Sequence, residues 1–441
     1  MTEFLWVGFA GIGVLIVLLL LGVHIAVALA VTGFMGVVAM RGIVPGASLL
    51  ATSFYYKIAN YSLITIPLFV LMGLLAASGG ISNKLYDAAT VWMGKVKAGL
   101  GIATVLACTA FGTVCGSSLV TASVFAKVSG PHMRSHGYAK RLAYGICASA
   151  GMIGMLIPPS VLAVVYSFVS GESVGKLQIA GTGPGLLLAV FYSGGLVLLS
   201  KIRPMWMAVP EQTTTPTWKE RFRSLLPTWP VLVVAVVIFG GIFRGVFSPT
   251  EAASVAAFVM LILFFIIKRV KVRSDLVAAF TDTATISAMI FAIMAGASVF
   301  AYFLILSGVT PLVISLILGL NLSPMALIIA IIILYLILGC FLDSISMVAL
   351  TVPVLHPVIV QMGIDPIWYA MVAIFAMEIG LITPPVGLNV FGTQAVAESD
   401  VTVEDVFAGS LPFFFMAAAA LILILIFPRI VTFFPDIIIP G

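Results

Sequence analysis

Long apolar stretches separated by short polar segments make up most of the chain. Stretches such as 4–23, 178–200, 231–243 and 250–267 can cross a hydrocarbon core of about 30 Å, some of them only when their flanks are counted. In lipid, the backbone must satisfy its own hydrogen bonds, which favours helices. The pattern therefore predicts an all-α polytopic membrane protein.

Two apolar segments carry small and polar residues near their centres. Residues 98–126 begin and end beside basic residues, and their middle contains Gly116 and the pair Ser117–Ser118. A segment that enters and leaves on one side of the membrane is a re-entrant hairpin, whose irregular tip needs protein or water around it. Residues 325–356 predict a second hairpin entering from the other side, with its tip near Asp343–Ser344.

A proline-rich signature occurs twice, 226 positions apart. Residues 153–159 read IGMLIPP, and residues 379–385 read IGLITPP. Glycine and a Pro-Pro pair interrupt a helix, because proline lacks a backbone donor and clashes with the preceding turn. Each hairpin should therefore be followed by a broken helix, at 140–170 and at 366–397. The same ungapped register aligns Pro131 with Pro357, Gly137 with Gly363, and Ser117–Ser118 with Asp343–Ser344.

The distribution of basic residues indicates that the two halves have opposite orientations. Residues 127–141 are basic, whereas their register partner 353–367 has no Lys or Arg, and neither residue type occurs between Arg273 and Arg429. The positive-inside rule places basic loops in the cytoplasm, so matching loops are expected on opposite sides. The basic regions are Lys84/Lys95/Lys97, Lys127/Arg134/Lys140/Arg141, Lys201/Arg203/Lys219/Arg221/Arg223 and Lys268/Arg269/Lys271/Arg273.

These patterns predict two inverted-topology repeats. Residues 1–202 would form the first, with scaffold helices, an interfacial arm, a hairpin and a broken helix, and residues 227–441 the second. The longest polar stretch, 203–226, would be the cytoplasmic linker. Aromatic residues beside charges predict interfacial helices at 48–60 and 82–97. Breaks at equivalent places in two halves point to the substrate and ion site of a secondary transporter.

The composition indicates a chain that is solvated by lipid. It is 62% hydrophobic and only 8% charged, whereas soluble domains carry about 25% charged residues. The net charge of +5 does not indicate a nucleic-acid partner, because the basic residues lie in short loops that set topology. The cysteines lie in apolar segments without a C-x-x-C pair, which favours buried thiols over a disulfide or a metal site; they are Cys108, Cys115, Cys147 and Cys340.

The hairpin tips carry the first candidate ligands. The hydroxyls of Ser117 and Ser118, with carbonyls freed at a tip, are hard oxygen ligands for a small cation, and freed N–H groups suit a carboxylate. Helix packing is the alternative. Asp343 is expected to be functional, since a carboxylate at the bilayer centre costs at least about 2.5–3.5 kcal/mol. A bound Na⁺ would offset that cost, and a capping role could coexist with it.

Polar residues also flank the second break. Thr383 and Asn389 could bind a carboxylate or Na⁺, with an interhelical hydrogen bond as the alternative. Glu378 lies in the stretch 274–428, which has no Lys or Arg to pair with it, so coupling to a cation or proton competes with an interfacial position. His132 and His136 have the i,i+4 spacing of a metal pair but no acidic third ligand, which favours a cytoplasmic loop.

The sequence does not indicate an enzyme, because no motif in it combines a nucleophile, a general base and an oxyanion site. The alternative from another class is an intramembrane serine hydrolase that uses Ser117 or Ser118 with a histidine at the same depth.

These motifs resemble the large membrane subunit of tripartite ATP-independent periplasmic (TRAP) transporters over nearly the whole chain. The resemblance rests on a series of ordered motifs: AFG at 110–112, GSS at 116–118, GYAKRL at 137–142, GMLIPPS at 154–160, FLD at 341–343, GIDP at 363–366 and EIGLITPPVGLN at 378–389.

The resemblance implies a Na⁺-driven importer of small organic acids, of the C4-dicarboxylate or sialic-acid class, in the bacterial inner membrane. Hairpins and broken helices would form the moving transport domain of an elevator. The partners would be a small four-helix membrane subunit and a periplasmic substrate-binding protein, with Na⁺ as coupling ion and no organic cofactor. The alternative is a self-sufficient divalent-anion/sodium symporter, which shares hairpins and inverted repeats but needs no binding protein.

By position, the resemblance also implies specific sites. The first Na⁺ site would contain Gly116, Ser117, Ser118 and Gly154, and the second Asp343, Thr383 and Pro384. Substrate would lie between the tips, near Ser118, Pro159, Ser344 and Asn389. The chain departs from the family at Met152 and Ala376, where related sequences often carry Thr and Asn.

Overall fold

A computed structural model describes residues 4–93, 96, 98–207, 216–243, 245–268, 270–320 and 322–438, except for the side chains of Lys57, Ile242 and Phe243. These residues form helices and no strands. Seven helices among them are long and apolar enough to cross a membrane, or eight if a pair bent by 48° counts as one span. The prediction of an all-α polytopic membrane protein is confirmed. Lys95, Lys97, Arg269 and linker residues 208–215 lie outside the described residues.

The helices of the first half follow the sequence pattern closely. In chain order they are α1 (Leu5–Leu20), α2 (Ile25–Arg41), α3 (Ile43–Ile58), η1 (Tyr61–Ile64), α4 (Thr65–Ser78), α5 (Ile81–Met93), α6 (Gly99–Cys115), α7 (Ser118–Ser135), α8 (Lys140–Ala150), α9 (Ile153–Leu156), α10 (Val161–Ser170), α11 (Val174–Ala180) and α12 (Thr182–Ile202).

The linker and second half begin with η2 (Pro204–Trp206). They continue through α13 (Trp218–Leu225), η3 (Leu226–Thr228), α14 (Trp229–Phe243), α15 (Pro249–Ile267), α16 (Val272–Leu306), α17 (Val309–Gly319), α18 (Pro324–Gly339), α19 (Ser344–Gln361), α20 (Pro366–Gly380), α21 (Leu388–Gln394), α22 (Val403–Ile426) and α23 (Arg429–Ile438).

Helix bounds in the second half repeat those of the first at the register of 226 positions. Shifting α7 by 226 positions gives 344–361, the bounds of α19, and shifting α6 gives 325–341, close to α18. The second segment of the first broken helix, α10, shifts to 387–396 and matches α21. Each half therefore contains a two-helix hairpin followed by a helix interrupted at a Pro-Pro pair.

Most of the segment 48–60, predicted as an interfacial helix, lies within a longer helix. This segment belongs to α3, which packs along α2 and α16 and leads through η1 into α4. Its residue Leu49 packs against the apolar cluster formed with α1, α2 and α16. Shifted by 226 positions, 43–78 becomes 269–304, the position of the continuous helix α16. The segment is therefore part of an interrupted counterpart of α16.

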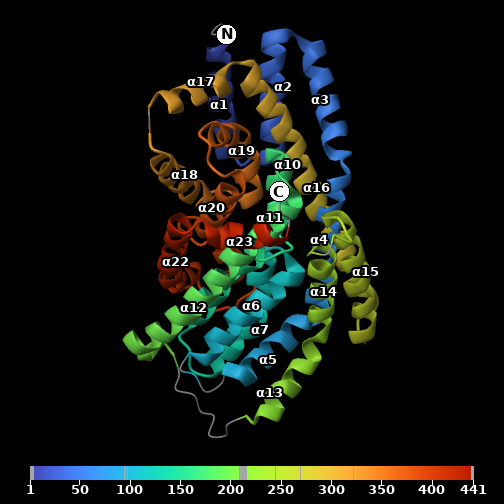
Figure 1. The fold of residues 1–441 in the computed structure, drawn as a ribbon, viewed down its shortest axis with the longest axis vertical. Coiled ribbons are helices and arrows are strands. Elements are labelled where there is room, and N and C mark those ends of the chain that lie inside the picture. The colour runs from blue at the N-terminus through green and yellow to red at the C-terminus, as the bar shows by residue number, and fades with distance from the viewer. Residues whose placement is uncertain are drawn as a thin grey trace.

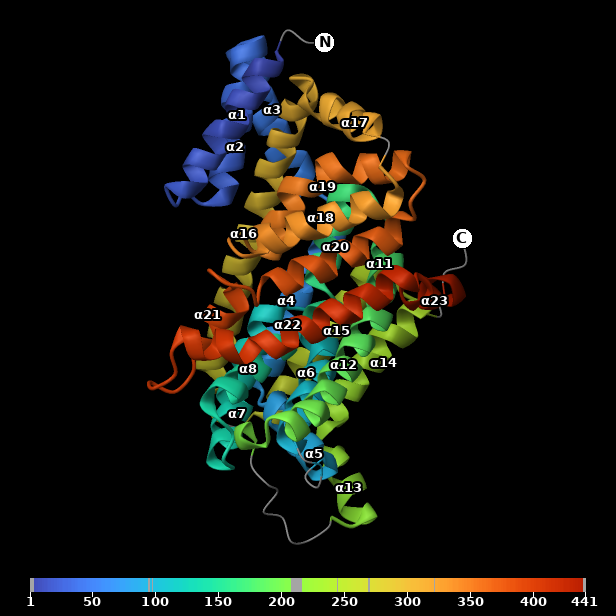
Figure 2. The ribbon, with the colours of Figure 1, turned by 90° about the vertical axis from the view of Figure 1, so that its left-hand side faces the viewer.

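The hairpins lie in different halves of the molecule. Both views place α6 and α7 toward the lower end and α18 and α19 toward the upper end (Figures 1 and 2). The helices α1, α2 and α3 reach the upper end beside α16, while α5 and α13 lie at the lower end (Figure 1). The hairpins thus approach the middle of the molecule from opposite ends, as inverted repeats require.

Acidic residues at equivalent positions join each hairpin to the other repeat. Glu172, after α10, has its Oε1 3.3 Å from His356 Nε2 on α19. Shifted by 226 positions, Glu172 becomes Glu398, which follows α21 and pairs with Arg134 on α7. Arg134 also donates to both carboxylate oxygens of Asp400 (2.7 and 2.9 Å). The solvent-accessible Arg134 pairs stabilise a fold weakly, so we interpret the contacts of Glu172 and Glu398 as fixing how the repeats meet.

The hydrogen bond from Arg134 lowers the pKa of Asp400 below its ordinary value. A lowered carboxyl pKa means that this contribution to stability is present above the ordinary Asp pKa and is lost only as the pH falls through the lowered value. The contact at this end of the molecule therefore persists throughout the neutral range.

The inverted orientation is tested by labelling at two exposed loop positions. In a chain whose native cysteines are replaced, we expect Ser135→Cys and Gly363→Cys to react with an impermeant maleimide from opposite sides of the membrane. Ser135 ends α7, and Gly363 follows α19. In intact cells the cysteine at 363 should label, and the one at 135 should label only after permeabilisation. Labelling of both from one side would contradict the inverted repeat.

Candidate functional site

The first hairpin tip contacts the first helix break directly. Gly116 adopts a left-handed conformation (φ +66°), and its carbonyl accepts a hydrogen bond from Val161 N–H (3.3 Å). A Cβ on Gly116 would lie 2.3 Å from Pro159 O. Ser117 caps α7, its hydroxyl accepting from Val120 N–H (3.4 Å). Glycine is therefore required at 116 both by its φ and by the close approach of Pro159.

Gly154 joins the same group through a threonine that sequence analysis had not singled out. A Cβ on Gly154 would lie 2.4 Å from Thr121 Oγ1, and this hydroxyl donates to Ser117 O (2.8 Å). The structure thus gathers Gly116, Ser117, Gly154 and Pro159 at one place, with Thr121 beside them. A hydroxyl one turn after Ser117 was the only sequence signal for Thr121.

The second tip contacts the second break in the same way. Val386 N–H donates to Cys340 O (3.1 Å), and a Cβ on Gly380 would lie 2.7 Å from the Cα of Gly339. The Thr383 hydroxyl donates to Ile379 O (2.9 Å). Thr383 and Pro384 therefore lie within the segment that packs on the tip, and the Pro384–Pro385 bond is cis, like Pro158–Pro159.

Asp343 caps the helix that follows the second tip. Its Oδ1 accepts hydrogen bonds from Ile345 N–H and Ser346 N–H (3.0 Å each), and its Oδ2 accepts one from the Ser346 hydroxyl. The structure confirms the helix-capping role that the sequence suggested for Asp343. The side chain is only half-buried, so a cation could reach the carboxylate without breaking the cap.

Glu378 lies where the two hairpin tips meet. It is fully buried (0% exposed), which excludes the interfacial position considered from the sequence. Its Oε1 accepts from the Ser344 hydroxyl (2.7 Å), and the Ser118 hydroxyl lies near the carboxyl group. Its Oε2 has no hydrogen-bond partner among the described residues. One carboxyl group thus lies beside Ser118 and Ser344, which come from different repeats.

Asn389 presents a second unpaired polar group. It lies on α21, which packs along α7, where the Ser123 hydroxyl donates to Gly392 O (3.2 Å). Asn389 is fully buried, and neither its Oδ1 nor its Nδ2 finds a partner within the described part of the chain; the same holds for Thr393 Oγ1. Leaving such a group unsatisfied costs about 1–3 kcal/mol. A ligand that pairs with it would recover that cost.

A small cavity of about 60 Å³ lies between the tips and two helices outside the hairpins. Cys115 and Ser117 line it from the first tip, and Ile345 lines it from the start of α19. The opposite wall comes from α4 and α16, with Val70, Gly73, Leu74, Ile286 and Ile290. The tips therefore face an apolar wall built by α4 and α16.

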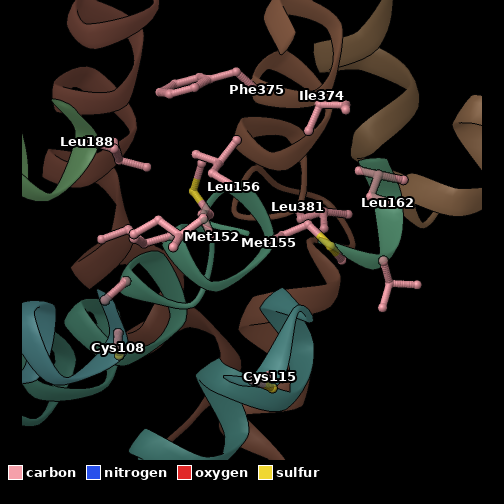
Figure 3. Packing of buried hydrophobic residues seen from close by; sticks show 14 of the residues in the cluster. Cys108, Cys115, Met152, Met155, Leu156, Leu162, Leu188, Ile374, Phe375 and Leu381 are labelled. Carbon is pink, nitrogen blue, oxygen red and sulfur yellow. The ribbon is translucent and has the colours of Figure 1, made fainter. Parts of the chain in front are cut away.

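Apolar side chains enclose the first break (Figure 3). Met152, Leu156, Phe375 and Leu381 belong to one cluster of buried apolar side chains and are labelled in this view. Met152, at one of the two positions where the sequence departs from the family, accepts a hydrogen bond from the Tyr192 hydroxyl through its sulfur (3.4 Å); Ala376, at the other, is fully buried. Such surroundings exclude water and strengthen polar interactions within the site.

Comparison with known proteins gives a consistent result. The family model "Tripartite ATP-independent periplasmic transporter, DctM component" matches residues 12–430. The chain is 34% identical to the C4-dicarboxylate TRAP transporter large permease protein DctM of Pseudomonas aeruginosa over 88% of each chain. It is 31% identical to the ectoine protein TeaC of Halomonas elongata, covering 97% of this chain and 98% of that one. It is 30% identical to the sialic acid protein SiaM of Vibrio cholerae, covering 86% and 87%.

Among solved structures, the Alcanivorax borkumensis YdaH transporter superposes with a TM-score of 0.58. The match covers 86% of this chain and 88% of that one at 14% sequence identity. At this identity the likeness concerns the fold alone.

Proposed function

Because the chain belongs to the DctM-component family of TRAP transporters, we propose that it is the transport subunit of a Na⁺-coupled importer of small organic acid anions. The observation that carries the proposal is the pair of buried, unpaired polar groups beside the hairpin tips, Glu378 Oε2 and the Asn389 amide. The names of relatives favour a C4-dicarboxylate or a sialic acid as substrate. The protein would be a multi-pass component of the bacterial inner membrane.

In this proposal, neutral donors bind the substrate anion. The Asn389 amide and the hydroxyls of Ser118 and Ser344 can donate to a carboxylate, and Pro159 lies beside the first tip. Glu378 would repel an anion unless its charge is offset. A cation bound beside the tips offsets it, which gives a physical reason for coupling anion uptake to Na⁺.

The two Na⁺ sites would use oxygen ligands at the tips and breaks. The first draws on Gly116, Ser117, Ser118 and Gly154, and the second on Asp343, Thr383 and Pro384. Hard oxygen ligands of this kind suit small cations. Two Na⁺ would balance a dicarboxylate, and each further net charge moved inward gains about 2.3 kcal/mol per 100 mV.

Movement of the hairpins and broken helices against a stationary scaffold would alternate access. The small cavity between the tips and the wall of α4 and α16 supports this division, because it lies between the tip residues and helices outside the hairpins. The small membrane subunit would support the scaffold, and the periplasmic binding protein would deliver substrate to the outer side.

A hydrolase based on Ser117 or Ser118 receives no support from the histidines. The Ser117 hydroxyl accepts from Val120 N–H. In the described chain, His132 contacts the Tyr86 hydroxyl (3.0 Å), His136 contacts His132 O, and His356 contacts Glu172. None of these histidines is placed as a base for either serine.

Asp343 variants test the proposed ion coupling. Asparagine caps helices as well as aspartate does, so we expect Asp343→Asn to fold normally. Without the charge, the Na⁺ concentration for half-maximal uptake should rise by about tenfold or more, equivalent to about 1.4 kcal/mol. The measurement is the Na⁺ dependence of uptake in proteoliposomes.

Asp365 supplies a matched control for this substitution. It caps α20 with the same geometry, accepting from Ile367 N–H (2.8 Å) and Trp368 N–H (2.9 Å). Asp365→Asn should leave Na⁺ dependence unchanged. Asp343→Ala should additionally lose the cap, at about 0.5–2 kcal/mol. Unchanged Na⁺ activation in Asp343→Asn would remove Asp343 from the ion site.

A further inference from the structure

Gln178 makes a two-point contact with the chain at the first helix break. Its Oε1 accepts a hydrogen bond from Ser160 N–H (2.8 Å), and its Nε2 donates to Ser160 O (3.0 Å). The side chain belongs to α11 and is 3% exposed. The Ser160 hydroxyl in turn accepts from Ala163 N–H in the first turn of α10 (3.2 Å). One side chain thus satisfies both main-chain groups of Ser160.

The break creates the need for this contact. Pro158 and Pro159 have no N–H, and the first N–H groups of a helix have no partner within it. A glutamine amide carries an acceptor and a donor side by side, which matches the N–H and C=O of a single residue. Leucine at this position could form neither bond, and an ionised glutamate could form only the first.

Ser160 lies between the two contacts that join the break to the first hairpin tip. On one side, Pro159 O faces Gly116, where an added Cβ would come within 2.3 Å. On the other side, Val161 N–H donates to Gly116 O (3.3 Å). Any movement of Ser160 would therefore change the approach of both neighbours to Gly116.

We infer that Gln178 is the positioning residue of the first Na⁺ site: it clamps Ser160, and thereby fixes the Pro159 carbonyl and the start of α10 against Gly116. The inference rests on the proposed function, since it assigns a role within the first of the two ion sites. Gln178 acts through Ser160 and needs no contact with ion or substrate.

The second repeat meets the same requirement differently. Ser160 shifted by 226 positions becomes Val386, whose N–H bonds directly to Cys340 O of the second tip (3.1 Å). Gln178 shifted by the same amount becomes Glu404, which is exposed in the first turn of α22. The Gln178 clamp is therefore a feature of the first repeat, and its removal should act on the ion site that contains Gly116.

The test compares Gln178→Leu and Gln178→Glu with Gln361→Leu, a glutamine exposed at the end of α19. In proteoliposomes, Gln178→Leu should raise the Na⁺ concentration for half-maximal uptake by about tenfold or more. The substrate KM at saturating Na⁺ should change much less. Gln178→Glu keeps the acceptor but replaces the donor with a second carboxylate oxygen that faces Ser160 O, so it should also raise the Na⁺ concentration for half-maximal uptake, while Gln361→Leu should match wild type.

Thermal shift by Na⁺ in the absence of substrate gives a second readout, because ligand binding stabilises the folded state. A smaller Na⁺ shift in Gln178→Leu supports the inference, and Gln178→Glu carries the comparison if the leucine variant does not fold. A lower melting temperature with unchanged Na⁺ half-saturation would show a purely structural role and overturn it. If wild type showed no Na⁺ dependence in either assay, the proposed function itself would fall, and this inference with it.

Discussion

Replacing Gly380 with alanine is expected to abolish uptake while leaving the chain in the membrane. A Cβ at this position would lie 2.7 Å from the Cα of Gly339 and 3.2 Å from Tyr335 O. Both neighbours are backbone atoms, so α20 and the second hairpin must separate. Overpacking of this kind costs about 1–3 kcal/mol, and because it displaces the tip itself we expect uptake below about a tenth of the wild-type rate.

The matched control is Gly194→Ala in the interior of α12, where an added Cβ meets nothing within 4 Å. Such a substitution should be neutral or stabilise by about 0.4–1 kcal/mol. Gly112→Ala should reproduce the defect in the first repeat, because its Cβ would lie 2.9 Å from the Cα of Gly154. Wild-type uptake in Gly380→Ala would mean that the hairpin and the broken helix do not pack as described.

Replacing Asn389 with leucine should separate function from stability. The substitution removes two buried amide atoms that have no partner in the described chain, so the melting temperature without substrate should stay the same or rise. If the amide binds the substrate anion, uptake should fall roughly 10- to 100-fold, as expected for a hydrogen bond to a charged group worth about 1.5–3 kcal/mol. The measurements are thermal unfolding of the purified protein and uptake in proteoliposomes.

Gln178→Leu serves as the control for Asn389→Leu, because it is expected to change the melting temperature in the opposite direction. In the wild-type chain, the Gln178 amide pairs with the N–H and C=O of Ser160. Removing the amide leaves these two buried main-chain groups unsatisfied. The melting temperature should therefore fall. An Asn389→Leu protein that is destabilised yet transports normally would show that Asn389 has a structural role, and the substrate assignment would be wrong.

The architecture was predictable because it depends on local signals. Pro-Pro pairs and glycines interrupt helices wherever they occur, so the breaks after Leu156 and Gly380 follow from the sequence. The ungapped register extends this information from a few motifs to whole helices, including α7 and α19. The start of helix α13 within the linker could also be predicted from the sequence, since Thr217 and Glu220 form a capping box there.

The site was only partly predictable, because its contacts are long-range. Glu378 aligns with Met152 in the repeat, so the register gives no indication that its carboxyl group meets Ser344 and Ser118. Gln178 aligns with the exposed Glu404 and has a structural partner 18 positions away. By contrast, Glu172 and Glu398 are both acidic at equivalent positions, a signal that could have identified the contacts between repeats.

The packing of segment 48–60 could not be predicted for a different reason. Aromatic and charged residues together indicate the headgroup level, but the same segment also carries Leu49, which packs against the cluster of α1, α2 and α16. Tertiary packing decides between these two uses of an amphipathic helix, and the pattern of residues alone does not.

The most direct measurement is uptake by proteoliposomes that contain this chain and its small membrane subunit. Labelled C4-dicarboxylates and sialic acid would be offered with and without an inward Na⁺ gradient, and with and without the cognate binding protein. We predict uptake of one of these acids only when both the gradient and the binding protein are present. Uptake that is independent of Na⁺ would contradict the proposed coupling, and Na⁺-driven uptake that ignores the binding protein would identify a self-sufficient symporter instead.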